Sequence, residues 1–164
     1  MRLYLLRHAE AGPFGEKLQA DDFSRRLTEK GIAQAGRVGE FLGRQGLSPE
    51  LMLSSPVLRA KETAEIVSTK LAKLGQSELL LAPWLACGMT PEIALHELAD
   101  YKRLESVMIV GHEPDFSGLV ATLLGAPSGD NINISKASLT IIDLARLTPG
   151  GGVLKLLLPV KLLK

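Results

Sequence analysis

The chain has 164 residues and a mass of 17.6 kDa, which suits one domain spanning residues 1–164. Apolar residues make up 46% of it and charged residues 23%, and these globular proportions exclude disorder over most of the chain. The formal net charge of +1 argues against a general nucleic-acid binder, so any anion site must be local. The single cysteine, Cys87, excludes an intramolecular disulfide and is compatible with a reducing compartment.

The apolar stretches of the chain predict a cytoplasmic protein. The first, residues 3–6, is too short for the core of a signal peptide. The most apolar, residues 153–163, is interrupted by Lys155, Pro159 and Lys161, and so falls short of the roughly 18 apolar residues of a membrane span. We interpret residues 153–163 as a buried strand, and we expect neither a membrane nor a nucleic acid as partner.

Short apolar runs alternate along the chain with amphipathic segments. Strands are predicted at six runs, residues 3–6, 51–54, 79–82, 106–110, 138–144 and 153–158. Helices are predicted between them at residues 28–45, 55–74, 90–104 and 115–124, where Thr28, Ser55-Pro56 and Thr90-Pro91 supply start signals. The glycines of residues 148–152 fit a hairpin turn between the last two strands. This order predicts an α/β fold, a single three-layer domain with helices on both faces of a mostly parallel sheet and an antiparallel end.

Unusual polar residues adjoin three of the predicted strands. Arg7 and His8 follow the first strand, His112 and Glu113 follow the fourth, and Arg59 lies in the first turn of the helix after the second. Ligands of open α/β sheets bind at the carboxyl ends of the strands, and a helical side chain such as Arg59 leans back toward those ends. Two arginines and two histidines would therefore converge near free helix amides and form a site for a dianion such as a phosphoryl group.

The histidines give this site a possible chemistry. A neutral, correctly oriented imidazole can accept a phosphoryl group through nitrogen, and this step requires no metal. The arginines and the second histidine would stabilise the charge on the phosphoryl oxygens. We therefore expect a site without metal or cofactor. Glu113 is either a proton donor beside His112 or an acid that favours the start of the following helix, and both interpretations stay open.

Four segments resemble motifs of the histidine phosphatase (phosphoglycerate mutase-like) superfamily, in the same order. Residues 5–9 (L-L-R-H-A) resemble its Arg-His-Gly signature, residues 53–64 its second arginine motif, and residues 110–112 its second histidine. Residues 25–31 (R-R-L-T-E-K-G) resemble the Arg-Pro-Leu-Thr-x-x-Gly segment of the small SixA-type phosphohistidine phosphatases. The short chain, which has no large insertion, favours the SixA-like branch.

The resemblance implies a phosphoglycerate mutase-like fold and a phosphatase that forms phosphohistidine on His8. It assigns the phosphate contacts to four further residues: Arg7, Arg59, His112 and, as an auxiliary contact, Arg25. Two positions depart from the family pattern, because Ala9 stands in place of the usual glycine and Arg26 in place of the proline. Glu113 is retained as an additional candidate for substrate binding.

The expected substrate class depends on the lack of an acidic residue after the third strand. Many mutases and ester phosphatases of the superfamily carry an acidic proton donor after the third strand, but residues 83–88 contain no acid, as in SixA-like members. Phosphohistidine has a comparatively good leaving group, so the resemblance implies a phosphorylated substrate such as a phosphohistidine-carrying signalling protein. Two alternatives stay open: a phosphatase of small phosphate esters, and a non-catalytic phosphate-binding or phosphoryl-carrier module.

The segment of residues 9–27 is the one candidate for a lid over this site. Its glycines, Pro13 and mixed charges predict a mobile, solvated loop and a shallow, accessible site. We interpret Asp22, within this segment, as a loop charge, and contact with the pocket is the less favoured alternative.

Overall fold

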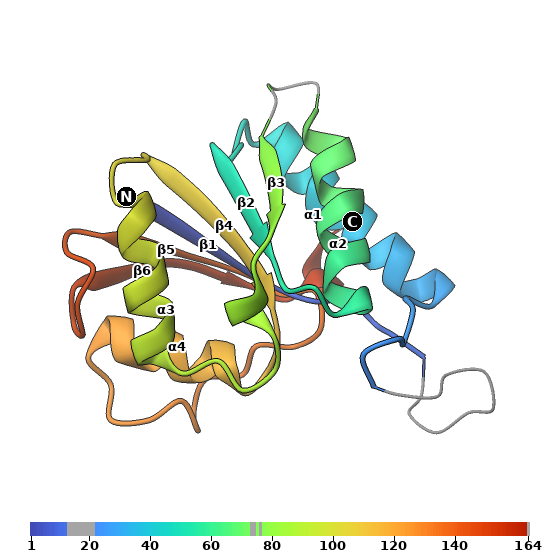
Figure 1. Cartoon of the computed structure of the whole chain (residues 1–164). Helices are drawn as coiled ribbons and strands as arrows, with labels where there is room; N and C mark the ends of the chain where they lie inside the picture. The colour runs from blue at the N-terminus through green and yellow to red at the C-terminus, as the bar shows by residue number, and fades with distance from the viewer. Residues whose placement is uncertain (13–21, 73–74, 76, 164) are drawn as a thin grey trace.

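The computed structural model describes residues 1–12, 22–72, 75 and 77–163, and a six-stranded sheet forms its centre (Figure 1). The strand order is β3-β2-β4-β1-β5-β6. The first four strands of this order run parallel to one another, whereas β5 is antiparallel to both of its neighbours. The strands are β1 (Arg2–Arg7), β2 (Leu51–Ser54), β3 (Glu78–Leu81), β4 (Ser106–Gly111), β5 (Leu139–Leu144) and β6 (Gly152–Leu158).

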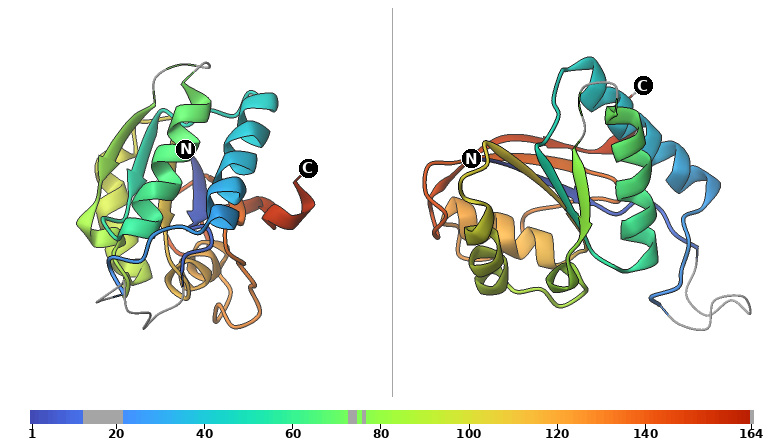
Figure 2. Two further views of the ribbon diagram at one scale, coloured as in Figure 1. Left: turned by 90° about the vertical axis from the view of Figure 1, so that its right-hand side faces the viewer. Right: turned by 45° about the horizontal axis from the view of Figure 1, so that its top comes forward.

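Helices cover both faces of the sheet, which confirms the predicted three-layer α/β architecture (Figure 2). Side chains alternate along β1: Tyr4 and Leu6 pack with α1 (Glu29–Arg44) and α2 (Leu58–Leu71), whereas Leu3 and Leu5 pack with α3 (Pro91–Leu98) and α4 (Asp115–Leu124). This alternation follows from the two-residue period of a strand. Short 3-10 turns lie at Pro83–Leu85, Ala99–Tyr101 and Val160–Leu162.

The first turn of α1 packs directly against the segment that follows His8. The Thr28 hydroxyl caps the helix by accepting a hydrogen bond from the Gly31 amide at 3.0 Å, and the Thr28 amide donates to the Glu10 carbonyl at 3.0 Å. A Cβ atom on Gly31 would overlap that same Glu10 carbonyl oxygen. The Leu-Thr-x-x-Gly pattern therefore has a structural reason, because it lets α1 anchor the chain just beyond His8.

Two helix boundaries differ from their predictions. α2 begins at Leu58 rather than at Ser55, because the Ser55 hydroxyl accepts a hydrogen bond from the Val57 amide at 3.2 Å and forms a turn before the helix. The predicted end of this helix at residue 74 lies outside the described residues. The helix predicted to run to residue 104 ends at Leu98 and continues as a 3-10 turn.

The prediction that residues 153–163 form a buried strand is wrong. β6 lies at the edge of the sheet, and its side chains Val153 and Leu154 are 59% and 42% exposed. The apolar run identified a strand correctly. It could not show that the strand has a neighbour on only one side.

Candidate active site

Three parallel neighbouring strands, β2, β4 and β1, bring their carboxyl ends to one edge of the sheet. His8 follows β1, Ser55 follows β2 and His112 follows β4. Backbone hydrogen bonds extend the sheet to two of these positions: the His8 amide donates to Gly111 at 3.0 Å, and the Ser55 amide donates to Val110 at 2.9 Å. Backbone pairing therefore brings the three strand ends together, as predicted.

His8 is held as a neutral imidazole with its lone pair on Nε2. Its Nδ1 lies 2.7 Å from the Ala9 carbonyl, and because a carbonyl can only accept, Nδ1 carries the proton. Its Nε2 accepts a hydrogen bond from Nε of Arg59 at 3.2 Å. Burial, with help from the charges of Arg59 and other neighbours, lowers the pKa of His8 from 6.5 to about 3. The ring therefore presents a nucleophilic nitrogen near neutral pH.

His112 leaves one ring nitrogen available to a ligand. Its Nε2 lies 2.9 Å from the Ser55 hydroxyl, whose oxygen also accepts a hydrogen bond from the Val57 amide. Its Nδ1 is buried and has no partner among the described residues, and it is an N–H donor in the tautomer in which Ser55 donates to Nε2. Burial is the main cause that lowers the pKa of His112 to about 4. The His8 and His112 rings lie 5.3 Å apart between centroids.

Arg59 lies in the first turn of α2 and is only 4% exposed. Its Nη1 donates to the Asp22 carbonyl at 2.7 Å, and its Nη2 donates to the Asp22 carboxylate at 3.0 Å. Nη2 also lies 3.5 Å from the Cys87 sulfur. Both terminal nitrogens are thus held by neighbouring residues, while Nε points at His8.

Arg7 and Glu113 flank this cluster. Arg7 is partly buried, its Nη1 donates to the Ile134 carbonyl at 2.7 Å, and its buried Nε has no partner among the described residues. The Glu113 carboxylate accepts a hydrogen bond from the Ser117 amide in the first turn of α4 at 3.1 Å, as expected for an acid that favours a helix start. Burial raises the pKa of Glu113.

Arg25 reaches the cluster through Asp22. Its Nε donates to the Asp22 carboxylate at 2.8 Å, and its Nη1 donates to the Gly12 carbonyl at 2.9 Å. Residues 13–21 of the predicted lid lie outside the described residues. The expectation of an open, accessible site is not met by the clustered side chains, since His8, Arg59 and His112 are each at most 7% exposed.

A family model described as the histidine phosphatase superfamily (branch 1) matches residues 3–80, a segment that contains both His8 and Arg59. An uncharacterized protein of Picosynechococcus sp. is 33% identical over 145 residues, which cover 85% of this chain and 82% of that protein. The chain belongs to the histidine phosphatase superfamily.

Two further comparisons place this histidine phosphatase in the SixA-like branch. Phosphohistidine phosphatase SixA of Escherichia coli is 29% identical over 124 residues, 75% of this chain and 74% of that protein. The solved structure of the protein histidine phosphatase SixA complexed with tungstate superposes with a TM-score of 0.83 at 25% identity and covers 100% of both chains. The phosphoglycerate mutase-like fold inferred from the motifs is therefore confirmed.

Sequence reasoning missed two residues of the histidine phosphatase site. Asp22, for which a loop charge was the favoured interpretation, is the counter-ion of Arg59. Thr63 is fully buried, and its hydroxyl accepts from the Ala9 amide at 3.0 Å and donates to the Arg59 carbonyl at 2.7 Å. The four-residue spacing of Arg59 and Thr63 on one helix face was a signal for Thr63, whereas nothing local in the sequence marks Asp22.

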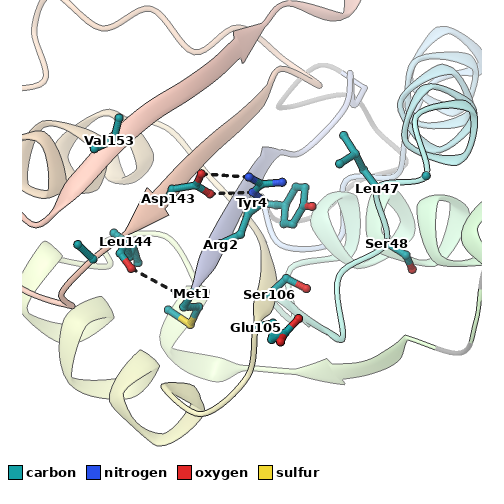
Figure 3. Close-up of a pocket in the computed structure, with 12 residues that line it drawn as sticks. Met1, Arg2, Tyr4, Leu47, Ser48, Glu105, Ser106, Asp143, Leu144 and Val153 are labelled. Atoms are coloured by element: carbon teal, nitrogen blue, oxygen red, sulfur yellow. Dashed lines mark hydrogen bonds and ion pairs between the residues drawn. The ribbon is translucent and has the colours of Figure 1, made fainter.

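A separate cavity of about 620 Å³ lies at the opposite end of the parallel strands (Figure 3). Its guanidinium, on Arg2, is paired with Asp143 through hydrogen bonds of 2.7 and 3.0 Å. None of the predicted site residues lines this cavity. The Arg2 guanidinium is thus already paired, whereas Arg7 at the carboxyl end has no carboxylate within ion-pair distance among the described residues, so the carboxyl end is the better anion site.

Within the ranges that the structure describes, no group of three or more His, Cys, Asp or Glu side chains is arranged to hold a metal ion. The helices in the same ranges are all too short or too polar to cross a membrane.

Proposed function

We propose that this histidine phosphatase removes a phosphoryl group from its substrate through a phosphohistidine intermediate at Nε2 of His8. The observation that carries the proposal is the 2.7 Å contact of His8 Nδ1 with the Ala9 carbonyl, because it leaves the lone pair on Nε2. In the first step Nε2 attacks phosphorus, the N–P bond forms, and the leaving group departs with the electrons of its bond to phosphorus. In the second step water attacks phosphorus, the N–P electrons return to Nε2, and inorganic phosphate is released.

Three donors would bind the phosphoryl oxygens: two that are buried without a partner, and one that loses its present acceptor when His8 is phosphorylated. Nε of Arg7 is buried without an acceptor among the described residues, as is Nδ1 of His112, which is a donor when Ser55 donates to Nε2. An oxyanion would satisfy both. The Arg59 Nε–H, which points at His8 Nε2 at 3.2 Å, becomes available to a phosphoryl oxygen once that nitrogen binds phosphorus. The positive charge that forms on the His8 ring is stabilised by the Ala9 carbonyl. Such preorganised groups stabilise developing charge most effectively where water is excluded.

We further propose that the substrate is phosphohistidine on a protein. The SixA relative supports this class, as does the lack of any acid in residues 83–88, because an imidazole leaving group needs less help from a proton donor than an alkoxide does. Arg25 would act on the bound phosphate indirectly, because it holds Asp22 in place. Glu113 would act through the electrostatic attraction of its carboxylate for the guanidinium of Arg7.

The test compares the wild type with His8→Ala and with His96→Ala, a matched control because His96 is exposed on α3. Phosphate release is measured in a chelator from a phosphohistidine-carrying domain, an aryl phosphate and a panel of sugar phosphates. We expect turnover by the wild type and by His96→Ala, and none by His8→Ala. Unchanged turnover in His8→Ala would remove His8 as the nucleophile.

The same experiment separates the alternatives. Stable, stoichiometric phosphorylation of His8 without phosphate release would indicate a phosphoryl carrier instead of a phosphatase. A sugar phosphate preferred by about a hundredfold, or ~2.7 kcal/mol in transition-state binding, would replace the proposed substrate while leaving the nucleophile unchanged.

A further inference from the structure

A cavity of about 460 Å³ lies beside Arg7 and is lined by residues of β1, of α1 and of the C-terminal 3-10 turn. We call it the cationic pocket and define it by its charged lining residues: Arg7, Glu10, Lys30, Lys136 and Lys161. Arg7 belongs both to this pocket and to the proposed phosphate site. The pocket and the proposed phosphate site therefore adjoin at this side chain.

The cationic pocket holds more positive charge than its own carboxylate can neutralise. Glu10 pairs with Lys30 at 2.7 Å, so these two charges cancel locally. Lys136 is exposed and acts on Glu10 only at longer range, where it lowers the pKa of that carboxyl together with Lys30. In the described part of the chain no carboxylate lies within ion-pair distance of Lys136 or Lys161.

Charge on the other flank of the proposed site has the opposite sign. A cavity of about 380 Å³ beside α4 is lined by two carboxylates, Glu113 and Asp130, and by no cation. The chain as a whole carries a net charge of only +1, so the cationic pocket is more positive than the chain is on average. Such an asymmetric field favours substrates that place negative charge on one side of the phosphoryl group.

We propose that the cationic pocket binds acidic side chains that flank the phosphorylated residue of a substrate protein. This inference rests on the proposed function, because it takes the His8 site as the place where the phosphoryl group binds. Lys136 and Lys161 are exposed and can meet carboxylates on a protein surface, and Arg7 joins their charge to the phosphate site. A small aryl phosphate, which has no second anionic group, does not use the pocket.

The test uses two fluorescent phosphopeptides that differ only in the residues flanking a non-hydrolysable phosphohistidine analogue, glutamates in one and glutamines in the other. Binding is measured by anisotropy at low and high salt. We expect the wild type to prefer the glutamate peptide by about five- to tenfold at low salt, the size expected from two or three exposed ion pairs, and to lose the preference at high salt.

The decisive variant is Lys136→Glu/Lys161→Glu, and its matched control is Lys102→Glu/Lys155→Glu, which changes net charge equally at exposed positions outside the pocket. We expect the preference to disappear in the first variant and to persist in the control. Both variants should turn over the aryl phosphate within about twofold of the wild type, since a small substrate does not reach the changed lysines. A wild type without the preference, or a preference equal in both variants, would overturn the proposal.

Measuring phosphate release by the wild type distinguishes a failure of this inference from a failure of the proposed function. If the wild type binds the glutamate peptide selectively but releases phosphate from neither a phosphohistidine domain nor the aryl phosphate, the pocket is supported and the proposed hydrolysis fails. If it releases phosphate but binds both peptides equally, the hydrolysis stands and the pocket fails.

Discussion

The Asp22 carboxylate forms an ion pair of 3.0 Å with Nη2 of Arg59, while the Asp22 carbonyl accepts from Nη1 of the same guanidinium. Asp22 thus holds both terminal nitrogens of a side chain that is 4% exposed, and it leaves Nε directed at His8. Burial acts to raise the pKa of Asp22, but Arg59 and Arg25 outweigh it and hold that pKa below its usual range. Asp22 is therefore ionised near neutral pH and fixes the orientation of the proposed phosphate clamp.

Asp22→Asn is expected to lower kcat/KM on an aryl phosphate by at least roughly tenfold, or 1.4 kcal/mol. The amide keeps the shape of the side chain but removes the charge that orients Arg59. Turnover is compared with Asp100→Asn, a change of an exposed aspartate far along the chain, and tungstate binding is measured alongside. Tighter tungstate binding with unchanged turnover would show that Asp22 competes with phosphate instead of positioning Arg59.

Arg59→Lys is expected to lower kcat/KM by at least about tenfold, which corresponds to 1.4 kcal/mol of transition-state stabilisation. One ammonium group cannot contact His8 and both acceptors of Asp22 at once, as the guanidinium does. Arg103→Lys, at an exposed position, serves as the control. Equal kinetics in Arg59→Lys and the control would place Arg59 outside the reacting site.

The pH dependence of kcat/KM is expected to lack an inflection near 6.5, the ordinary pKa of histidine. His8 must be neutral to attack phosphorus, and its pKa of about 3 keeps it neutral at all higher pH values. Activity should therefore fall only as acidification approaches the pKa of His8, about 3. The profile is measured with the titration of the substrate determined separately. A loss of rate centred near pH 6.5 that belongs to the enzyme would contradict this electrostatic account.

Gly31→Ala is expected to lower the free energy of unfolding by about 1–3 kcal/mol, because the new methyl group would overlap the Glu10 carbonyl. Gly36→Ala is the matched control in the same helix, since a Cβ there meets no atom within 4 Å. The control should raise the stability by about 0.5–1 kcal/mol through the better helix propensity of alanine. Urea unfolding of both variants measures the difference, and equal stabilities would mean that α1 does not pack closely against the segment after His8.

The parts of this molecule that could be predicted are those fixed by short stretches of sequence. His8 and His112 directly follow apolar runs, and Arg59 lies one turn into a capped helix, so the parallel sheet brings them together once its topology is known. Asp22 could not be predicted in the same way, because its contact with Arg59 spans 37 positions and depends on the path of a loop. The exposure of β6 was missed for a related reason. The hydropathy of a strand does not show whether the strand lies in the middle of the sheet or at its edge.

The proposed intermediate on His8 is tested most directly by rapid quenching during turnover of a phosphohistidine-carrying domain. The reaction is stopped in alkali, in which phosphohistidine survives, and the modified residue is located by peptide mass spectrometry and its nitrogen by phosphorus NMR. The account predicts a phosphoryl group on Nε2 of His8 that forms and decays at rates compatible with turnover. A phosphoryl group on another residue, or steady turnover with no covalent intermediate in wild-type protein, would contradict it.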